Sequence, residues 1–312
     1  MQAPRRIVMS EVGPRDGLQI WPEQIPVEQK VALIDALSAT GLAKIEATGF
    51  AHPKIVPQLA DAAEVLAAVQ RRPGVKLAAF VPNAKGAERA VAARVDEFKC
   101  GAAASETFNR LNVRMSIDQA LTIFDEIAGV ARGAGGIISG VIGTAFGCPY
   151  EGPVREDRVL EIAARYAKAG ASVVYLADTT GMANPRQVES LSRKVKQAVP
   201  QIAVGLHLHN TRGSGIANAL AGLDAGVTEF EASIGGLGGC PYAPKAVGNI
   251  CTEDFVHMAH EMGIETGVDL DALLKVAEFT QEAVGRALPG MVMKAGKASE
   301  RADKAAPRMK ID

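Results

Sequence analysis

The sequence predicts an α/β protein in which eight parallel strands close into a (β/α)8 TIM barrel with an extra C-terminal helix. Strand-like and helix-like runs alternate along the chain, an order that is typical of a parallel sheet. Eight such units, each of roughly thirty residues, favour a closed barrel. The runner-up is an open doubly wound sheet, but its glycine-rich phosphate turn after the first strand is missing from the sequence.

The predicted strands are short runs that are mostly apolar. They cover Ile7–Val12, Lys44–Thr48, Lys76–Val81, Glu97–Ala102, Ile137–Gly143, Ser172–Ala177, Ala203–His209 and Thr228–Ser233.

The helices between the strands carry recognisable ends. We expect one over Val27–Thr40 that stops at Gly41, because glycine readily adopts the left-handed conformation that follows a helix. Another covers Val56–Gln70. Ser116 opens a capping box, and Asn184 is a cap followed by proline at the first helical position.

The end of the chain completes the barrel and leaves a tail. Asp254–Met262 is expected to be the eighth outer helix, and Asp269–Ala287 the extra helix that closes the barrel. We therefore assign residues 5–290 to a catalytic barrel domain. Residues 291–312 are polar without periodicity, and we expect a mobile, solvated tail.

Composition excludes several classes of protein. The net charge of −1 gives no support for binding to nucleic acid or membranes, and no apolar run is long enough to span a bilayer. The four cysteines, Cys100, Cys148, Cys240 and Cys251, match neither a disulfide framework nor a zinc site. We expect free thiols in a reducing compartment, the cytoplasm.

Ionisable side chains gather where the predicted strands end, which is where barrel active sites lie. His207 and His209 end the seventh strand, and residues two apart point to the same face of a strand. Asp16 follows the first strand, and Asn249 follows the eighth. One carboxylate, two imidazoles and one amide oxygen suit Mg²⁺ or Mn²⁺, with Zn²⁺ also compatible. Taken alone, the histidines could be core or surface residues, and Asn249 a turn residue.

Two further residues suggest chemistry beside that site. Arg15 precedes Asp16, and a cation beside a metal is useful where an anion develops between the two. Alternatively, Arg15 forms a structural ion pair with Glu46 or Asp178. Cys240 follows the glycine-rich segment from Gly235 to Gly239, which could move as a lid and carry the thiol to the site. Its other interpretation is a small buried residue in a tight turn.

Three segments together resemble the 3-hydroxy-3-methylglutaryl-CoA lyases, within a wider set of metal-dependent barrel lyases and Claisen condensing enzymes. They are Gly13-Pro14-Arg15-Asp16-Gly17-Leu18-Gln19, His207-Leu208-His209, and Gly236-Leu237-Gly238-Gly239-Cys240-Pro241-Tyr242-Ala243. The resemblance covers about Ile7 to Leu288. The cysteine loop is specific to the lyase branch, whereas the pair of histidines is shared more widely.

The resemblance implies a role for each site residue. Asp16, His207, His209 and Asn249 would hold the divalent cation. Arg15 would stabilise the enolate of the departing acetyl-CoA, and Cys240 would transfer a proton. Glu46 and Asp178 would be supporting catalytic or orienting acids. The substrate would be an acyl-CoA thioester, cleaved in the family reaction to acetyl-CoA and acetoacetate, with a role in leucine degradation and a dimeric assembly.

The chain also departs from the family pattern around the substrate mouth. Ile20-Trp21 replaces the usual Asn-Glu, Gly49 the usual Ser, and Arg212 a frequent Tyr. The alternatives are therefore a lyase for citramalyl-CoA or a longer 3-hydroxyglutaryl-CoA, a Claisen condensing enzyme, and a non-catalytic barrel that binds CoA esters.

Overall fold

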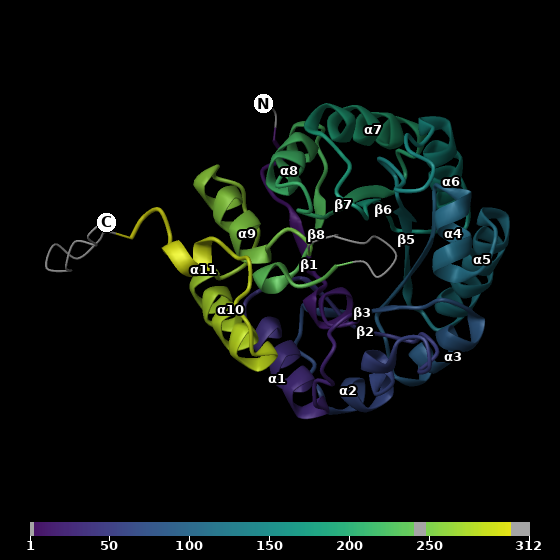
Figure 1. Cartoon of the computed structure of the whole chain (residues 1–312). Coiled ribbons are helices and arrows are strands. Elements are labelled where there is room, and N and C mark those ends of the chain that lie inside the picture. Colours follow the sequence, from purple (N-terminus) through teal and green to yellow (C-terminus); the bar gives the residue numbers. More distant parts are fainter. Residues whose placement is uncertain (1–2, 240–247, 301–312) are drawn as a thin grey trace, which may run out of the picture.

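The computed structural model describes residues 3–239 and 248–300, and these form a closed barrel of parallel strands with β8 paired to β1 (Figure 1). The predicted barrel is confirmed. The strands are β1 (Val8–Glu11), β2 (Lys44–Gly49), β3 (Lys76–Phe80), β4 (Glu97–Ala103), β5 (Ile137–Gly143), β6 (Val173–Asp178), β7 (Ala203–Leu208) and β8 (Glu229–Ala232). Each lies within two residues of its predicted bounds.

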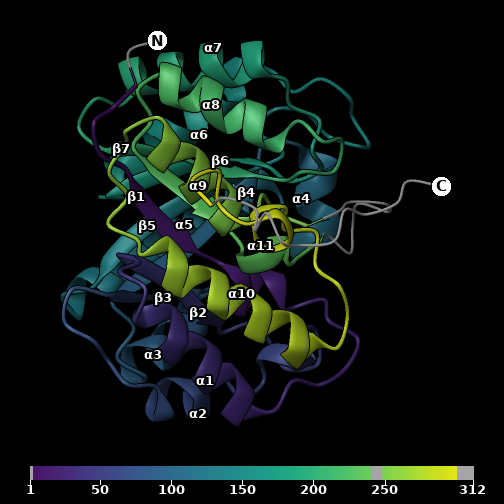
Figure 2. The ribbon, with the colours of Figure 1, turned by 90° about the vertical axis from the view of Figure 1, so that its left-hand side faces the viewer.

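Helices surround the barrel, as Figures 1 and 2 show from two directions. They are α1 (Val27–Ser38), α2 (Ala62–Ala68), α3 (Ala84–Ala92), α4 (Glu106–Val113), α5 (Ile117–Gly133), α6 (Glu156–Lys168), α7 (Pro185–Ala198), α8 (Gly215–Asp224), α9 (Thr252–Glu261), α10 (Leu270–Val284) and α11 (Val292–Ala295). Three shorter turns are η1 (Gly13–Gly17), η2 (Pro57–Leu59) and η3 (Ile234–Gly236).

The predicted helix ends have the expected physical basis. Ser116 and Asn184 each form a complete capping box, with Pro185 in the first turn of α7. Gly41 has a φ of +86°, and a Cβ on it would lie 2.2 Å from the carbonyl oxygen of Gly267. Only glycine fits this left-handed position without displacing the neighbouring backbone.

The single helix predicted over Val56–Gln70 is wrong, because the structure divides it into η2 and α2. Lys30 is buried beneath the break, and its ammonium donates to the carbonyl oxygen of Gln58 at 2.5 Å and to Asp61 at 2.7 Å. A carbonyl engaged by a side chain is diverted from the helical ladder. The interruption therefore depends on a residue of α1, which local periodicity does not show.

The extra helix is present as α10, which begins after its cap Asp269 and ends at Gly285. It packs between α9 and α1 on the outside of the barrel (Figures 1 and 2). Beyond it, Val292 is buried, and its backbone N–H donates to Asp254 at 2.7 Å. The polar, mobile tail over residues 291–312 stays a prediction, with α11 as its one described helix.

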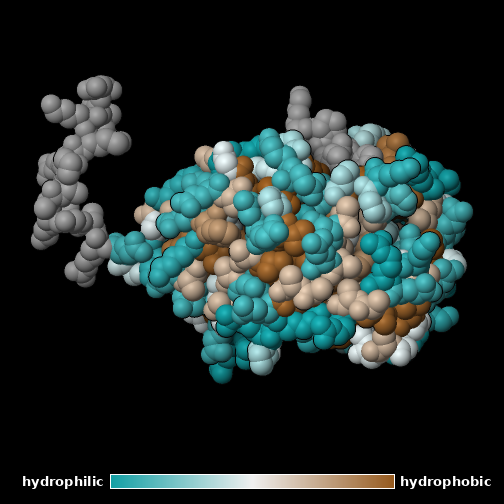
Figure 3. Space-filling model, turned by 90° about the horizontal axis from the view of Figure 1, so that it is seen from below, coloured by the Kyte–Doolittle hydropathy of each residue, from teal (hydrophilic) through white to brown (hydrophobic). Residues whose placement is uncertain are grey.

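Apolar side chains pack in the layer between the strands and the helices, whereas paired charges such as Lys99 and Glu231 lie inside the barrel. Gly140 of β5 shows how close the two layers are, since a Cβ there would lie 2.2 Å from the ring of Tyr166 on α6. No helix in the described ranges is long and apolar enough to cross a membrane. On the face seen in Figure 3, apolar side chains gather in patches between polar ones.

Candidate metal centre at the carboxyl ends of the strands

The two histidines come from the end of β7. His207 and His209 are both buried, at 7% and 3% exposure. Their Nε2 atoms lie 3.2 Å apart, as expected for side chains two residues apart on one face of a strand. His209 also pairs with Asn249 in an isolated β-bridge, which ties the end of β7 to the segment that follows the eighth strand.

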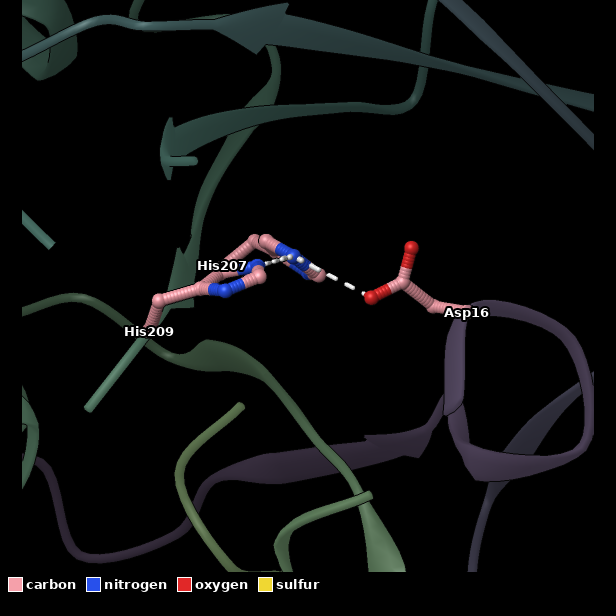
Figure 4. Close-up of side chains that lie close together, drawn as sticks. All are labelled: Asp16, His207 and His209. Carbon is pink, nitrogen blue, oxygen red and sulfur yellow. Dashed lines mark hydrogen bonds and ion pairs between the residues drawn. The ribbon is translucent and has the colours of Figure 1, made fainter. Parts of the chain in front are cut away.

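Asp16 faces these imidazoles from the other side of the site (Figure 4). It lies in η1, the turn directly after β1, and its Oδ2 atom is 3.9 Å from Nε2 of His207. One ligand atom from each of Asp16, His207 and His209 lies within 4.8 Å of the others. Two strand ends far apart in the sequence therefore bring to one place three side chains that could hold a metal ion.

Asn249 lies against this cluster. Its Nδ2 atom donates to Oδ2 of Asp16 at 2.8 Å and to the carbonyl oxygen of Leu237 at 3.1 Å. Its Oδ1 atom is buried without a hydrogen-bond partner among the described residues. A buried acceptor of this kind is costly unless something binds it. A divalent cation would satisfy that oxygen, so the residues present fit a metal with mixed nitrogen and oxygen ligands.

Glu231 on β8 orients the first histidine. Its Oε2 atom accepts a hydrogen bond from Nδ1 of His207 at 2.8 Å, which leaves the Nε2 lone pair facing the site. Burial by itself would lower the pKa of His207, but the hydrogen bond and charge of Glu231, with the charge of Asp16, raise it above its ordinary value. A proton on this imidazole would therefore compete with any metal ion bound there.

Arg15 lies between Asp16 and Glu46. Its Nη1 atom is 2.9 Å from Oδ1 of Asp16, and its Nε atom is 2.6 Å from Oε1 of Glu46. Its guanidinium also lies 5.0 Å from the ring centre of Phe80. Burial would lower the pKa of Arg15, yet the charges of Glu46 and Asp16 raise it further above its usual range. The guanidinium is thus a fixed positive charge beside the candidate metal site.

Asp178 lies at the end of β6 and has no described contact with Arg15. Of the two ion pairs considered for Arg15, the structure therefore contains the one with Glu46. The Oδ1 atom of Asp178 accepts from the backbone N–H groups of Met182 and Ala183, at 2.8 and 3.1 Å. Burial raises its pKa to about 6. Its Oδ2 atom is buried without a hydrogen-bond partner among the described residues.

Two buried carboxyl groups hold the start of the glycine-rich segment. Glu11 accepts from the backbone N–H of Ile234 at 2.8 Å, and Glu253 accepts from that of Gly235 at 3.0 Å. Burial raises the pKa of Glu11 to about 7 and that of Glu253 to about 8. Cys240, the proposed proton-transfer residue, lies outside the described residues.

Sequence reasoning missed the charges inside the barrel. Lys99, Glu231, Lys44 and Glu229 are buried or nearly so, yet they lie within segments interpreted only as strands. The available signal was that Glu229 and Glu231 alternate within a predicted buried strand, as do Glu97 and Lys99. Charges at alternate positions share one face, and an inward face must pair them.

A separate surface depression of about 660 Å³ lies beside the ends of β4 and β5. Arg110 and Arg158 on its lining pair with Glu106 and Glu161, and Arg155 pairs with Asp157. None of the three described metal-binding side chains lines it. The chemistry of the metal centre therefore gives a better candidate site than this cavity.

The comparisons with known proteins agree with this geometry. The HMGL-like family profile matches residues 6–280. A mitochondrial hydroxymethylglutaryl-CoA lyase from Bos taurus is 44% identical, covering 91% of this chain and 87% of that protein. An (R)-citramalyl-CoA lyase from Chloroflexus aurantiacus is 41% identical, covering 93% and 95%.

A solved structure is equally similar. An HMG-CoA lyase from Acinetobacter baumannii, in complex with coenzyme A and 3-methylmalate, superposes with a TM-score of 0.92 at 42% identity, covering 96% of this chain and 98% of that one. The family profile spans most of the barrel, including both strand ends that carry the metal-binding side chains. This chain therefore belongs to the HMGL-like family.

Proposed function

We propose that this protein is a divalent-metal-dependent carbon–carbon lyase that cleaves 3-hydroxy-3-methylglutaryl-CoA into acetyl-CoA and acetoacetate. The observation that carries the proposal is the convergence of Asp16, His207 and His209, with Arg15 beside them, in a chain of this family. A retro-Claisen cleavage needs the tertiary hydroxyl group deprotonated and the thioester enolate stabilised.

Asp16, His207, His209 and Oδ1 of Asn249 would hold the cation, which we propose to be Mg²⁺ or Mn²⁺. Bound there, it supplies a Lewis acid that lowers the pKa of the substrate hydroxyl group. These four protein ligands would leave room at the cation for oxygens of the substrate.

Arg15 would stabilise the charge that appears on the thioester oxygen as the carbon–carbon bond breaks. Its ion pair with Glu46 fixes the guanidinium before the substrate arrives, and a preorganised positive charge acts without further reorganisation. Cys240 would transfer the proton that the enolate carbon needs, and Asp178 would be a supporting acid. Both roles are what the resemblance to the family implies.

A lyase for citramalyl-CoA is the second candidate, because the relative with that name is about as similar as the hydroxymethylglutaryl-CoA lyases. Two apolar residues replace polar residues of the family pattern, the exposed Ile20 and its neighbour Trp21. The ring of Trp21 lies 3.9 Å from the guanidinium of Arg286. We infer that these residues help to determine which acyl group the enzyme accepts.

A panel of acyl-CoA thioesters separates these candidates. We expect release of acetyl-CoA from 3-hydroxy-3-methylglutaryl-CoA in the presence of Mg²⁺ or Mn²⁺, and none after chelation. A higher kcat/KM with citramalyl-CoA would favour the second candidate. Binding of thioesters without metal and without turnover would contradict both and favour a non-catalytic barrel. A dimeric assembly, a cytoplasmic location and a role in leucine degradation stay predictions, and sedimentation tests the first.

A further inference from the structure

Lys99 of β4 is a fully buried cation in the barrel interior. Its Nζ atom lies 2.5 Å from Oε1 of Glu231 on β8 and 3.5 Å from Oε2 of Glu46 on β2, and it donates to the hydroxyl of Ser10 on β1 at 3.0 Å. Three strands other than its own are thereby joined through one ammonium group. A buried charge is tolerated only where it is paired in this way.

Each of the two carboxylates uses its second oxygen to hold a residue of the candidate site. Oε2 of Glu231 accepts from Nδ1 of His207 at 2.8 Å. Oε1 of Glu46 accepts from Nε of Arg15 at 2.6 Å. Lys99 is therefore one step removed from both a proposed metal ligand and the proposed enolate-binding guanidinium, although it has no described contact with either.

The charges favour this arrangement. The Lys99 ammonium lies 2.5 Å from Oε1 of Glu231 and balances its negative charge, while Nδ1 of His207 donates to Oε2 at 2.8 Å. A charged carboxylate is a stronger acceptor for an imidazole N–H than a neutral carboxyl group. Without Lys99, two carboxylates would share the barrel interior with less compensating charge.

We propose that Lys99 is a positioning residue whose ammonium fixes Glu231 against His207 and Glu46 against Arg15, so that the two halves of the site keep one geometry. The inference rests on the proposed function, and it assigns a role to a residue that does not touch the substrate or the cation. Through Glu231 it sets the direction of the Nε2 lone pair of His207, and through Glu46 the place of the guanidinium.

The chain offers a matched control in Lys44 of β2. Its ammonium is also largely buried and also faces two carboxylates, Glu229 at 3.1 Å and Glu97 at 3.3 Å. Besides Lys44, Glu229 has Tyr175 as a described partner and Glu97 has Ser139. Neither partner belongs to the candidate metal site. The ring of Tyr175 lies 5.0 Å from Lys99 and so stands between the two clusters.

The experiment compares Lys99→Met with Lys44→Met. Affinity for Mn²⁺ is measured by titration calorimetry and by the electron paramagnetic resonance signal of free Mn²⁺. The kinetic constants kcat and KM are measured with the hydroxyacyl-CoA as substrate. Both variants lose one buried ammonium, so we expect both to unfold more easily. Lys99→Met should also bind Mn²⁺ at least about tenfold more weakly, the lower end for losing an indirect support of a ligand, and its kcat should fall more than its KM rises. Lys44→Met should bind Mn²⁺ within about twofold of the wild type, because no described hydrogen bond or ion pair of Glu229 or Glu97 reaches a residue of the candidate site.

Equal Mn²⁺ affinities of the two variants would overturn the proposal. If Lys99→Met does not fold, the charge-balanced variant Lys99→Met/Glu46→Gln takes its place and is compared with Glu46→Gln alone, because both keep Glu231 against His207. We expect the double variant to bind Mn²⁺ at least about tenfold more weakly than Glu46→Gln, and equal affinities of these two variants would again refute the role of Lys99.

The metal readout keeps this inference separate from the proposed function. A wild type that binds Mn²⁺ but cleaves no hydroxyacyl-CoA would contradict the function and leave the role of Lys99 standing, provided Lys99→Met still weakens Mn²⁺ binding. A wild type that cleaves the substrate, beside a Lys99→Met variant with unchanged Mn²⁺ affinity, would contradict the inference alone.

Discussion

Glu253 contributes to the pH dependence of this protein's stability, and Glu253→Gln should remove that contribution. The carboxyl group is buried on α9, and its Oε2 atom accepts from the backbone N–H of Gly235 at 3.0 Å. Burial, with smaller contributions from the charges of Asp254 and Glu11, raises its pKa from 4.5 to about 8. A glutamine has nearly the same shape and retains an acceptor oxygen, but it takes up no proton in this range.

The sign follows from where the proton is held. Below about pH 4.5 the carboxyl group is protonated in both the folded and the unfolded chain, so its stabilising effect is fully present there. Between about pH 4.5 and 8 the folded protein keeps a proton that the unfolded chain releases. The free energy of unfolding therefore falls as the pH rises through this range.

The magnitude follows from the size of the shift. One pKa unit corresponds to about 1.4 kcal/mol, so the full difference is about 5 kcal/mol, as an upper bound. Between about pH 6 and pH 9 the contribution of Glu253 alone should fall by about 3 kcal/mol. Glu11, with a pKa of about 7, adds a loss of the same sign at lower pH, and this loss remains in the variant.

The assay is urea unfolding of the metal-free protein at several pH values between about pH 6 and pH 9. We expect the wild-type free energy of unfolding to fall more steeply than that of Glu253→Gln, with a difference on the order of 2 to 3 kcal/mol over the range. Glu261→Gln, an exposed change at the end of the same helix, should leave the wild-type slope unchanged. Equal slopes for the wild type and Glu253→Gln would refute the reasoning, because no differential proton uptake would then reside at this carboxyl group.

Three further outcomes are expected. Arg15→Met should lower kcat at least about a hundredfold, the usual loss for removing a group that binds a developing oxyanion, while Mn²⁺ binding by calorimetry persists; near-normal turnover would refute its role. Asn249→Ala should weaken Mn²⁺ binding about tenfold or more, since it removes the buried oxygen that has no other described partner, and unchanged affinity would remove Asn249 from the ligand set. Gly140→Ala should destabilise the fold by about 1 to 3 kcal/mol, because its Cβ would lie 2.2 Å from the ring of Tyr166. Gly129→Ala is the control and should be neutral or stabilising, because nothing lies within 4 Å of the added carbon. Thermal unfolding of both variants measures the difference.

The sequence by itself determined the barrel and predicted which side chains form the candidate metal site. Strand and helix periodicities are local, so each strand could be located within two residues, and the caps at Ser116 and Asn184 were evident from adjacent residues. The pair His207 and His209 could be predicted to share a face because alternation along a strand is fixed by the backbone. Asp16 could be added because parallel strands place their carboxyl ends on one rim.

Only the tertiary structure decided which charges meet inside the barrel. Lys99, Glu46 and Glu231 come from three strands, and the closure of the sheet sets which of their side chains face one another across the interior. In the same way, Lys30 of α1 divides the helix predicted over Val56–Gln70, and Arg15 pairs with Glu46 rather than Asp178. These contacts depend on distances between segments far apart in the chain, whereas periodicity and capping depend only on neighbours.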